Sequence, residues 1–97
     1  MPYNFSIRIE FDPRKDAENR RKHGASLAFG AEVLSDPRRL DTSDARFDYA
    51  ESRFVSYGMV EGRVWACVFV MRGNVHRIVS VRKANEREQR RYRDVSR

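Results

Sequence analysis

The sequence predicts an α+β fold in a single domain spanning residues 1–97. Segments with strand-like alternation begin the chain and fill its second half, helix start and stop signals lie between them, and a basic helical segment ends it. A chain of 97 residues has room for one hydrophobic core, and 40% hydrophobic with 11% aromatic residues can form it. We expect the order β-α-α, then an antiparallel sheet meander, then a C-terminal helix.

The first predicted elements are a short strand and two helices. The strand is indicated by apolar residues that alternate with polar ones, namely Phe5, Ile7, Ile9 and Phe11. Asp12-Pro13 supplies an N-cap and a proline at the first helical position, and Gly24 supplies a left-handed C-cap, so a helix is predicted over residues 13–23. The more apolar segment 26–34 predicts a second helix, which we expect to lie on the core.

The second half of the chain predicts the sheet and the last helix. Residues 38–51 suggest an irregular or edge strand, and we expect turns from Gly58 to Gly62 and at Arg72-Gly73-Asn74. The clearer strands lie between these turns, at 53–57, 64–71 and 75–81. The middle strand is apolar on both faces, so a second layer or a partner must cover the face that the helices leave open. Asn85 and Glu88 predict a capping box that opens the final helix.

The positive charge is concentrated at the C-terminus. The net charge is +6, and residues 72–97 hold 9 basic and 3 acidic side chains, whereas the rest of the chain is balanced. Of the 20 basic residues 17 are arginine, whose planar fork of donors suits phosphate or carboxylate. Nucleic acid or an acidic protein is therefore the expected partner.

One side of the helix predicted over residues 13–23 carries an unusual set of polar side chains. At about 100° per residue they fall within one arc: Asp12, Lys15, Asn19, Lys22 and His23. They form either a solvated face whose cations sit at the negative helix C-terminus, or a surface that faces a phosphate. In the second case Lys22 offsets phosphate charge and His23 transfers a proton, because histidine titrates near neutrality.

A second set of candidates lies around the last predicted strand. Alternation places Arg77 on one face with Val75, Val79 and Val81, so its charge must be paired, reach solvent along its stem, or line a cleft. Arg72 precedes this strand and Arg82-Lys83 ends it; on the functional interpretation such a cluster binds the scissile phosphate and stabilises charge in the transition state. Trp65, on the middle strand, either packs in the core or stacks on a base.

Taken in order, these residues resemble the BrnT toxins of bacterial type II toxin–antitoxin systems. The resemblance covers nearly the whole chain and rests on Phe11-Asp12, Lys15, Asn19, Lys22-His23-Gly24, Asp36-Pro37, Glu51-Ser52-Arg53, Gly58, and the run from Arg77 to Ala84 with Glu88 and Tyr92. Two positions depart from the family pattern. Phe11 stands where the family usually has tryptophan and Val81 where it usually has alanine, and both exchanges are apolar.

The resemblance implies a RelE-like fold and a metal-independent RNA endonuclease that inhibits translation and needs no cofactor. The implied chemistry is attack of a ribose 2′-hydroxyl on the adjacent phosphate. Carried over position by position, the catalytic candidates are Lys22, His23, Arg53, Arg77 and Arg82, with the roles of base and acid left open. The RNA-binding candidates are Arg72, Lys83, Arg87, Arg90 and Arg91.

The resemblance also implies a partner, a BrnA-type antitoxin encoded beside the toxin. The antitoxin would dock on the toxin, dimerise the complex into a heterotetramer through its own DNA-binding domain, and make the only contact with operator DNA.

Because Cys67 is the only cysteine, no internal disulfide is possible. No window of 18 apolar residues and no signal peptide is recognisable, so we expect a cytoplasmic protein without a membrane span.

A second hypothesis belongs to a different class of function. The chain would be a non-catalytic basic domain that binds RNA or DNA, or a subunit of a protein complex. In that case the same arginines only neutralise phosphates or contact an acidic protein, and binding is salt-sensitive and sequence-blind. Intact RNA after long incubation would favour this hypothesis over the ribonuclease.

Overall fold

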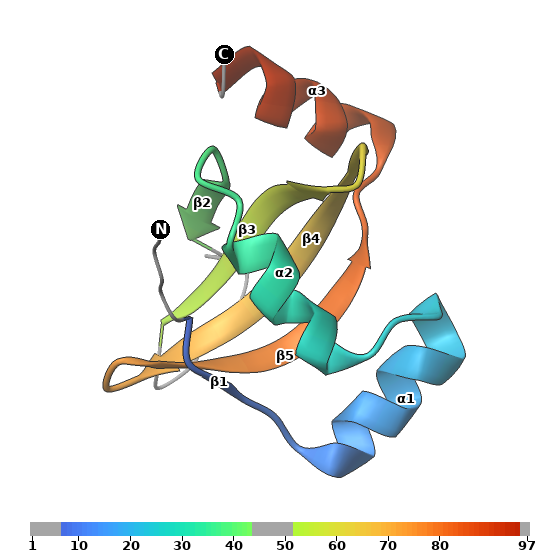
Figure 1. Ribbon diagram of the computed structural model, residues 1–97, viewed down its shortest axis with the longest axis vertical. Helices are drawn as coiled ribbons and strands as arrows, with labels where there is room; N and C mark the ends of the chain where they lie inside the picture. The colour runs from blue at the N-terminus through green and yellow to red at the C-terminus, as the bar shows by residue number, and fades with distance from the viewer. Residues whose placement is uncertain (1–6, 44–51, 96–97) are drawn as a thin grey trace.

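The computed structural model describes residues 7–43 and 52–95 and confirms the α+β class (Figure 1). Its strands form one sheet in the order β1-β5-β4-β3-β2, in which β1 pairs in parallel with β5 and the other neighbours are antiparallel. The strands are β1 (Ile9–Glu10), β2 (Leu40–Ser43), β3 (Arg53–Val60), β4 (Arg63–Arg72) and β5 (Val75–Lys83). The helical segments are α1 (Pro13–His23), the 3-10 turn η1 (Leu27–Phe29), α2 (Gly30–Leu34) and α3 (Glu86–Val95). The RelE-like fold implied by the resemblance stays a prediction.

The caps of α1 are those that the sequence predicts. The Asp12 carboxylate accepts a hydrogen bond from the Arg14 amide at 2.9 Å, and Gly24 adopts a φ of 71° while its amide donates to the Arg20 carbonyl. The predicted second helix is different, because the segment divides into η1 and the short α2. Ser26 caps η1 through the Ala28 amide at 3.0 Å.

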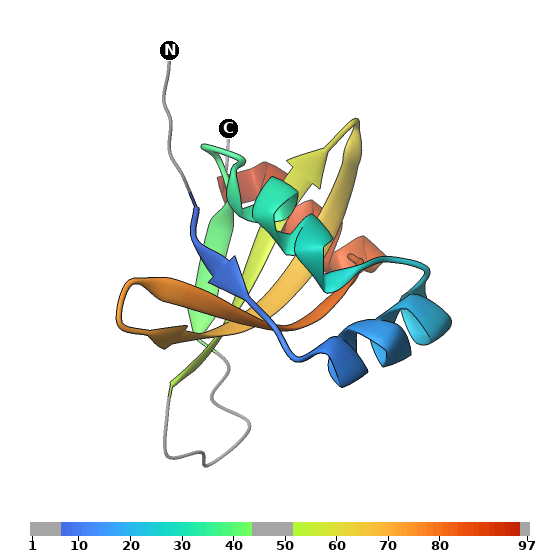
Figure 2. The same cartoon turned by 60° about the horizontal axis from the view of Figure 1, so that its bottom comes forward.

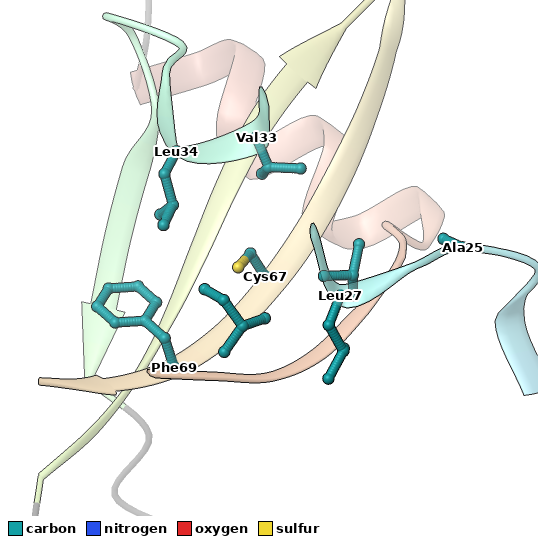
Figure 3. Close-up of a cluster of buried hydrophobic side chains, with 8 residues drawn as sticks. Ala25, Leu27, Val33, Leu34, Cys67 and Phe69 are labelled. Atoms are coloured by element: carbon teal, nitrogen blue, oxygen red, sulfur yellow. The ribbon is translucent and has the colours of Figure 1, made fainter. Parts of the chain in front are cut away.

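The larger part of the core lies between the sheet and the η1–α2 segment (Figure 3). As expected, this segment lies on the core: Leu27, Val33 and Leu34 are fully buried. They pack against side chains of β4 and β5, namely Cys67, Phe69, Ile78 and Val81. Burial raises the pKa of the Cys67 thiol to about 12, so this cysteine is a core residue and not a nucleophile.

The other face of the sheet is covered by α3, which lies behind the sheet when α2 is in front (Figure 2). Tyr92 is the buried residue of α3, and it packs with Ala84 against β3 and β4. The sheet residues of this second cluster are Val55, Tyr57, Val64 and Ala66. A second layer of the same chain therefore covers the face that the apolar middle strand required.

The predicted strands are present in the structure, including an edge strand within residues 38–51, but their lengths differ from the prediction. The first strand is reduced to Ile9–Glu10, and Phe5 lies outside the described residues. The irregular segment contains β2 at the sheet edge, whereas residues 44–51 lie outside the described part of the chain. The predicted strands 53–57, 64–71 and 75–81 are each longer in the structure. No helix among the described residues is long and apolar enough to cross a membrane.

Gly58 lies inside β3 and not in a turn, which corrects the prediction. A Cβ atom at this position would lie 2.3 Å from the carbonyl oxygen of Val33, so β3 passes directly under α2. Glycine is thus needed for close approach of two backbones. The turn itself is formed by Glu61 and Gly62, both with positive φ.

A bulge at Val79 changes which residues share a face of β5. Val68 pairs with Ser80 and Phe69 pairs with Ile78, so Val79 is an extra residue without a partner in the register. The bulge turns Val81 into the core below η1, while Arg77 stays on the opposite face from Ile78. The prediction that Arg77 and Val81 share a face is therefore wrong.

Gly58→Ala tests the close approach of β3 and α2. The added methyl must displace the Val33 backbone, which is not a flexible group. We expect the free energy of unfolding to fall by about 1–3 kcal/mol, measured by urea denaturation. Ala31→Gly, on the half-buried side of α2, should cost only about 1 kcal/mol through helix propensity. Equal stability of Gly58→Ala and the wild type would contradict this packing.

Candidate functional site

Asn19 fixes α1 against the edge of the sheet. Its side chain is 5% exposed and bridges two segments: the amide nitrogen donates to the carbonyls of Ala25 and Val81, each at 2.8 Å. Its amide oxygen accepts from the Val81 amide at 3.2 Å, so Asn19 pairs with β5 as a neighbouring strand would. Because β1 reaches only His76 and Arg77, α1 occupies the rest of this edge (Figure 1).

Asp16 secures the same helix to η1. Its carboxylate accepts hydrogen bonds from the Leu27 amide at 2.7 Å and the Ser26 hydroxyl at 3.0 Å, and it pairs with Arg20 at 3.2 Å. The hydrogen bond from Leu27 is the main reason that the pKa of Asp16 lies below its ordinary value. Asn19 and Asp16 together set the direction in which the C-terminal end of α1 points.

Three arginines gather on the α3 side of the sheet, at the end away from α3. Arg53 pairs with Val70 across β3 and β4, and Val70 pairs with Arg77 across β4 and β5, so the two arginines flank one valine in a row across the sheet. Adjacent strands are about 4.8 Å apart, which places the Arg53 and Arg77 backbones about 10 Å apart. Arg72 lies two residues beyond Val70 on β4, so it projects from the same face.

These arginines and α1 form two adjoining depressions. The arginine cleft, of about 150 Å³, is lined by Asp12, Lys15, Arg53, Arg72, Arg77 and Val79. The helix-end cleft, of about 200 Å³, is lined by Lys15, Glu18, Asn19, Lys22, His23 and Val79. Lys15 and Val79 line both clefts, so the two adjoin between α1 and the sheet, and together we call them the basic groove.

Arg77 is held by a carboxylate at the sheet edge. Its guanidinium donates to the Glu10 carboxylate at 2.8 Å, and both side chains are partly exposed. Glu10 is the register partner of Arg77 on β1, so the pair follows from the parallel pairing of these strands. This ion pair holds one terminal nitrogen of the Arg77 guanidinium, while the groove stays open to solvent.

Arg82 lies in a different environment, under α3. Its guanidinium makes two hydrogen bonds to the Glu88 carboxylate, at 2.8 and 2.9 Å, and the Tyr57 hydroxyl donates to the same carboxylate at 3.2 Å. The hydrogen bonds from Arg82 hold the pKa of Glu88 at about 2, and burial beside Glu88 raises the pKa of Tyr57. Arg82 pairs with Ala66, four residues along β4 from the row of Arg53 and Arg77, or about 13 Å away.

The same carboxylate caps α3. The Glu88 carboxylate accepts a hydrogen bond from the Asn85 amide, and the Asn85 side chain accepts one from the Glu88 amide, each at 2.8 Å, which is the predicted capping box.

At the other end of α3, the Tyr92 hydroxyl donates to Asp36, which also accepts from the amides of Met59 and Arg38. Burial opposes ionisation of Asp36, but these hydrogen bonds outweigh it, so its pKa is lowered. Burial together with this bond raises the pKa of Tyr92 to about 12.

A family model supplies the decisive comparison. It describes the ribonuclease toxin BrnT of type II toxin–antitoxin systems, and it matches residues 11–88 of the 97-residue chain. The chain belongs to the BrnT toxin family. It is accordingly a ribonuclease toxin of a type II system, in which a toxin is paired with an antitoxin. No curated protein matches the chain.

The structure brings together most of the BrnT residues that the sequence singles out. Lys22 and His23 line the helix-end cleft, and Arg53, Arg72 and Arg77 line the arginine cleft. The remaining candidates lie elsewhere. Arg82 is bound to Glu88, Lys83 lies near the Trp65 ring, and the exposed outer surface of α3 carries Arg87, Arg90 and Arg91.

Two residues of the clefts are not among the predicted catalytic or RNA-binding residues, namely Lys15 and Asn19. Lys15 is the residue shared by the two clefts, and Asn19 is the buried residue that positions them. Both lie on the polar arc that the sequence shows on this helix, so their positions could be found. Their roles could not, because the arc alone does not reveal that β5 lies beside it.

Glu88→Gln tests the attachment of α3 in this BrnT toxin. The pKa of Glu88 is about 2 in the folded protein and 4.5 ordinarily, so on acidification the unfolded chain takes up the proton first. The stabilisation is therefore complete above about pH 5 and is lost as the pH falls towards 2. Near pH 7 we expect the substitution to lower the free energy of unfolding by about 1–2 kcal/mol, a value reduced by the partial exposure of Arg82.

Urea denaturation near pH 7 and again near pH 3 measures the effect, and the difference between variant and wild type should shrink at about pH 3. Glu86→Gln, on the exposed side of the same helix turn, is the matched control and should change little. A constant difference at both pH values would contradict the assigned role of the carboxylate.

Proposed function

We propose that the chain is a metal-independent endoribonuclease whose substrate lies in the groove formed by the arginine cleft and the helix-end cleft. The observation that carries this proposal is the convergence of cationic groups from one helix and three strands on that groove. Lys15, Lys22 and His23 come from α1, and Arg53, Arg72 and Arg77 from the sheet. Family membership supplies the ribonuclease activity, and the groove offers RNA phosphates three arginines in one cleft and Lys22 with His23 in the adjoining one.

The proposed step uses the 2′-hydroxyl of the substrate. Its oxygen forms a bond to the adjacent phosphorus while the bond from phosphorus to the 5′-oxygen breaks. The proton of the 2′-hydroxyl goes to a basic group, and the leaving 5′-oxygen takes a proton, so the products are a 2′,3′-cyclic phosphate and a 5′-hydroxyl. In this scheme His23 transfers one of the two protons, and Arg53, Arg77 and Lys22 stabilise the negative charge on the phosphoryl oxygens.

The other candidate residues take peripheral roles in the proposal. Arg72 contacts the RNA backbone at the mouth of the arginine cleft. Lys83 and the exposed arginines of α3, which are Arg87, Arg90 and Arg91, contact more distant phosphates by charge alone. Arg82 lines neither cleft and would reach the RNA only by exchanging the Glu88 carboxylate for a phosphate, since both ligands suit its fork of donors.

The biological setting follows from the family. We propose a BrnA-type antitoxin as the partner, a heterotetramer as the complex, and inhibition of translation in the cytoplasm as the consequence of RNA cleavage. Operator DNA would be contacted only by the antitoxin. The toxin's +6 charge favours an acidic surface on the partner, and such a surface would compete with RNA for the same groove.

Substitutions on α1 and β5 test the catalytic groove. We expect Lys22→Ala and Arg77→Ala each to slow RNA cleavage by about 100-fold, because each removes a cation that stabilises the transition state. Cleavage of a labelled RNA by the purified full chain is the measurement, with product ends identified by their reactivity to kinase and phosphatase. Arg21→Ala is the matched control, since Arg21 neighbours Lys22 but lines neither cleft and pairs with Glu18 at the surface. It should leave the rate within about twofold of the wild type.

Two substrate controls complete this test. RNA with 2′-O-methyl groups should bind and stay intact, because the attacking hydroxyl is blocked. Addition of EDTA should leave the rate unchanged. Intact RNA after long incubation, with salt-dependent binding, would contradict the proposal and support the non-catalytic nucleic-acid binder instead.

A further inference from the structure

A third depression lies on the far side of the turn that ends α1. This aromatic cleft has a volume of about 450 Å³, within the usual range for small-molecule sites. It is lined by Gly24, Ser26, Ala28, Phe29, Glu32 and Trp65, so its walls come from the end of α1, from η1–α2 and from β4. It is mostly apolar, in contrast to the basic groove.

The ring of Trp65 forms one wall of this cleft. Its neighbours on β4, Ala66 and Cys67, are fully buried, whereas Trp65 and Phe29 are only partly buried. The two rings meet edge to face, with centroids 4.8 Å apart and an angle of 67° between their planes. Trp65 thus packs its ring against Phe29 while part of its surface lines the open cleft, where a planar ligand can stack on it.

The polar groups of the cleft favour a nucleobase over a phosphate. None of the described lining residues is basic, and the one charged group is the Glu32 carboxylate. A carboxylate accepts hydrogen bonds, so it selects a base with N–H donors on its edge. Guanine fits this requirement best, because its N1–H and N2–H groups lie side by side and match the two carboxylate oxygens. Lys83, which is not one of the lining residues, places its ammonium over the Trp65 ring at 6.0 Å from the centroid, a cation–π contact from which it can also reach the backbone of a bound strand.

The aromatic cleft adjoins the basic groove through a short and fixed segment. His23 lines the helix-end cleft, and the next residue, Gly24, lines the aromatic cleft. The turn is held in place by Asn19, which binds the Ala25 carbonyl on one side and Val81 on the other. A strand whose phosphate lies beside Lys22 and His23 can therefore pass over this turn and place a base on Trp65.

We propose that the aromatic cleft is a nucleobase subsite that takes a guanine near the scissile phosphate, stacked on Trp65 and hydrogen-bonded by Glu32. The inference rests on the proposed ribonuclease function and adds to it a preference for guanine close to the cleavage position. It assigns the positioning of substrate to Trp65 and Glu32, neither of which takes part in the chemical step.

Trp65 is the only tryptophan of the chain, so its fluorescence reports directly on this cleft. The probes are 2′-O-methyl uridine tetramers, which cannot be cleaved, with one guanosine, adenosine or cytidine placed at each position in turn. We expect guanosine tetramers to quench Trp65 and to bind about tenfold more tightly than the all-uridine tetramer. Glu32→Gln should abolish this preference, whereas Glu61→Gln, an exposed carboxylate in the β3–β4 turn, should retain it.

Fluorescence anisotropy of labelled tetramers gives an independent measure of binding. Trp65→Phe keeps an aromatic platform, so it should lose the quenching signal but keep the guanosine preference. The proposal is overturned by tetramers that bind without changing Trp65 emission, by equal affinity for guanosine and uridine tetramers, or by failure of every tetramer to bind. Emission that responds to the partner protein but to none of the tetramers would also overturn it and would assign the cleft to protein docking.

Cleavable RNA of the same sequences separates this inference from the catalytic proposal. Quenching by guanosine tetramers with cleavable RNA left intact would uphold the subsite and refute the nuclease reaction. Efficient cleavage with no preference for guanosine would refute the subsite alone. Cleavage concentrated next to guanosine, lost in Glu32→Gln and retained in Glu61→Gln, is the result that the proposal predicts.

Discussion

The hydrogen bonds of Asn19 are the interaction on which the groove depends. A buried amide must satisfy its donors and acceptor, and Asn19 does so by binding both polar groups of Val81 and the carbonyl of Ala25. These bonds place α1 where β1 ends, so that Lys15 and Lys22 face the same groove as the arginines of β3 to β5. Without them α1, which has no large apolar residue, has little to hold it on the sheet. The basic groove therefore depends on polar side chains of α1, with Asn19 binding the sheet and Asp16 binding η1, and not on hydrophobic packing of this helix.

Carboxylates play the corresponding part at the other end of the molecule. The basic helix α3 buries Tyr92 as its main apolar contact, and its position is fixed by Glu88 and by Asp36. Each of these carboxylates accepts hydrogen bonds from several elements at once, which keeps it ionised and makes the attachment directional. The fold thus distributes the basic side chains among three places: some line the groove, Arg82 holds α3, and others lie on the α3 surface.

The sequence predicts those features that local chemistry decides. The Asp12 and Gly24 caps, the capping box of Asn85 and Glu88, and the apolar β4 are all found where expected. It fails where tertiary contacts decide. The Val79 bulge, the passage of Gly58 under Val33, and the pairing of Arg82 with Glu88 each depend on a neighbour distant in space, which alternation and turn propensities do not report. For the site, Lys22, His23, Arg53, Arg72 and Arg77 are predicted and found in two adjoining clefts. The sequence also places Lys15 beside Lys22 and His23, but that Lys15 lines the arginine cleft as well follows only from the structure.

The central claim is that α1 and the sheet form one RNA-binding surface. Amide chemical shifts of the isotope-labelled full chain, recorded during titration with a 2′-O-methyl RNA, test it most directly. The account predicts that residues of α1 around Lys15 and Lys22 and residues of the sheet around Arg53 and Arg77 shift together and give one dissociation constant. Shifts confined to α3, or separate dissociation constants for α1 and the sheet, would contradict it.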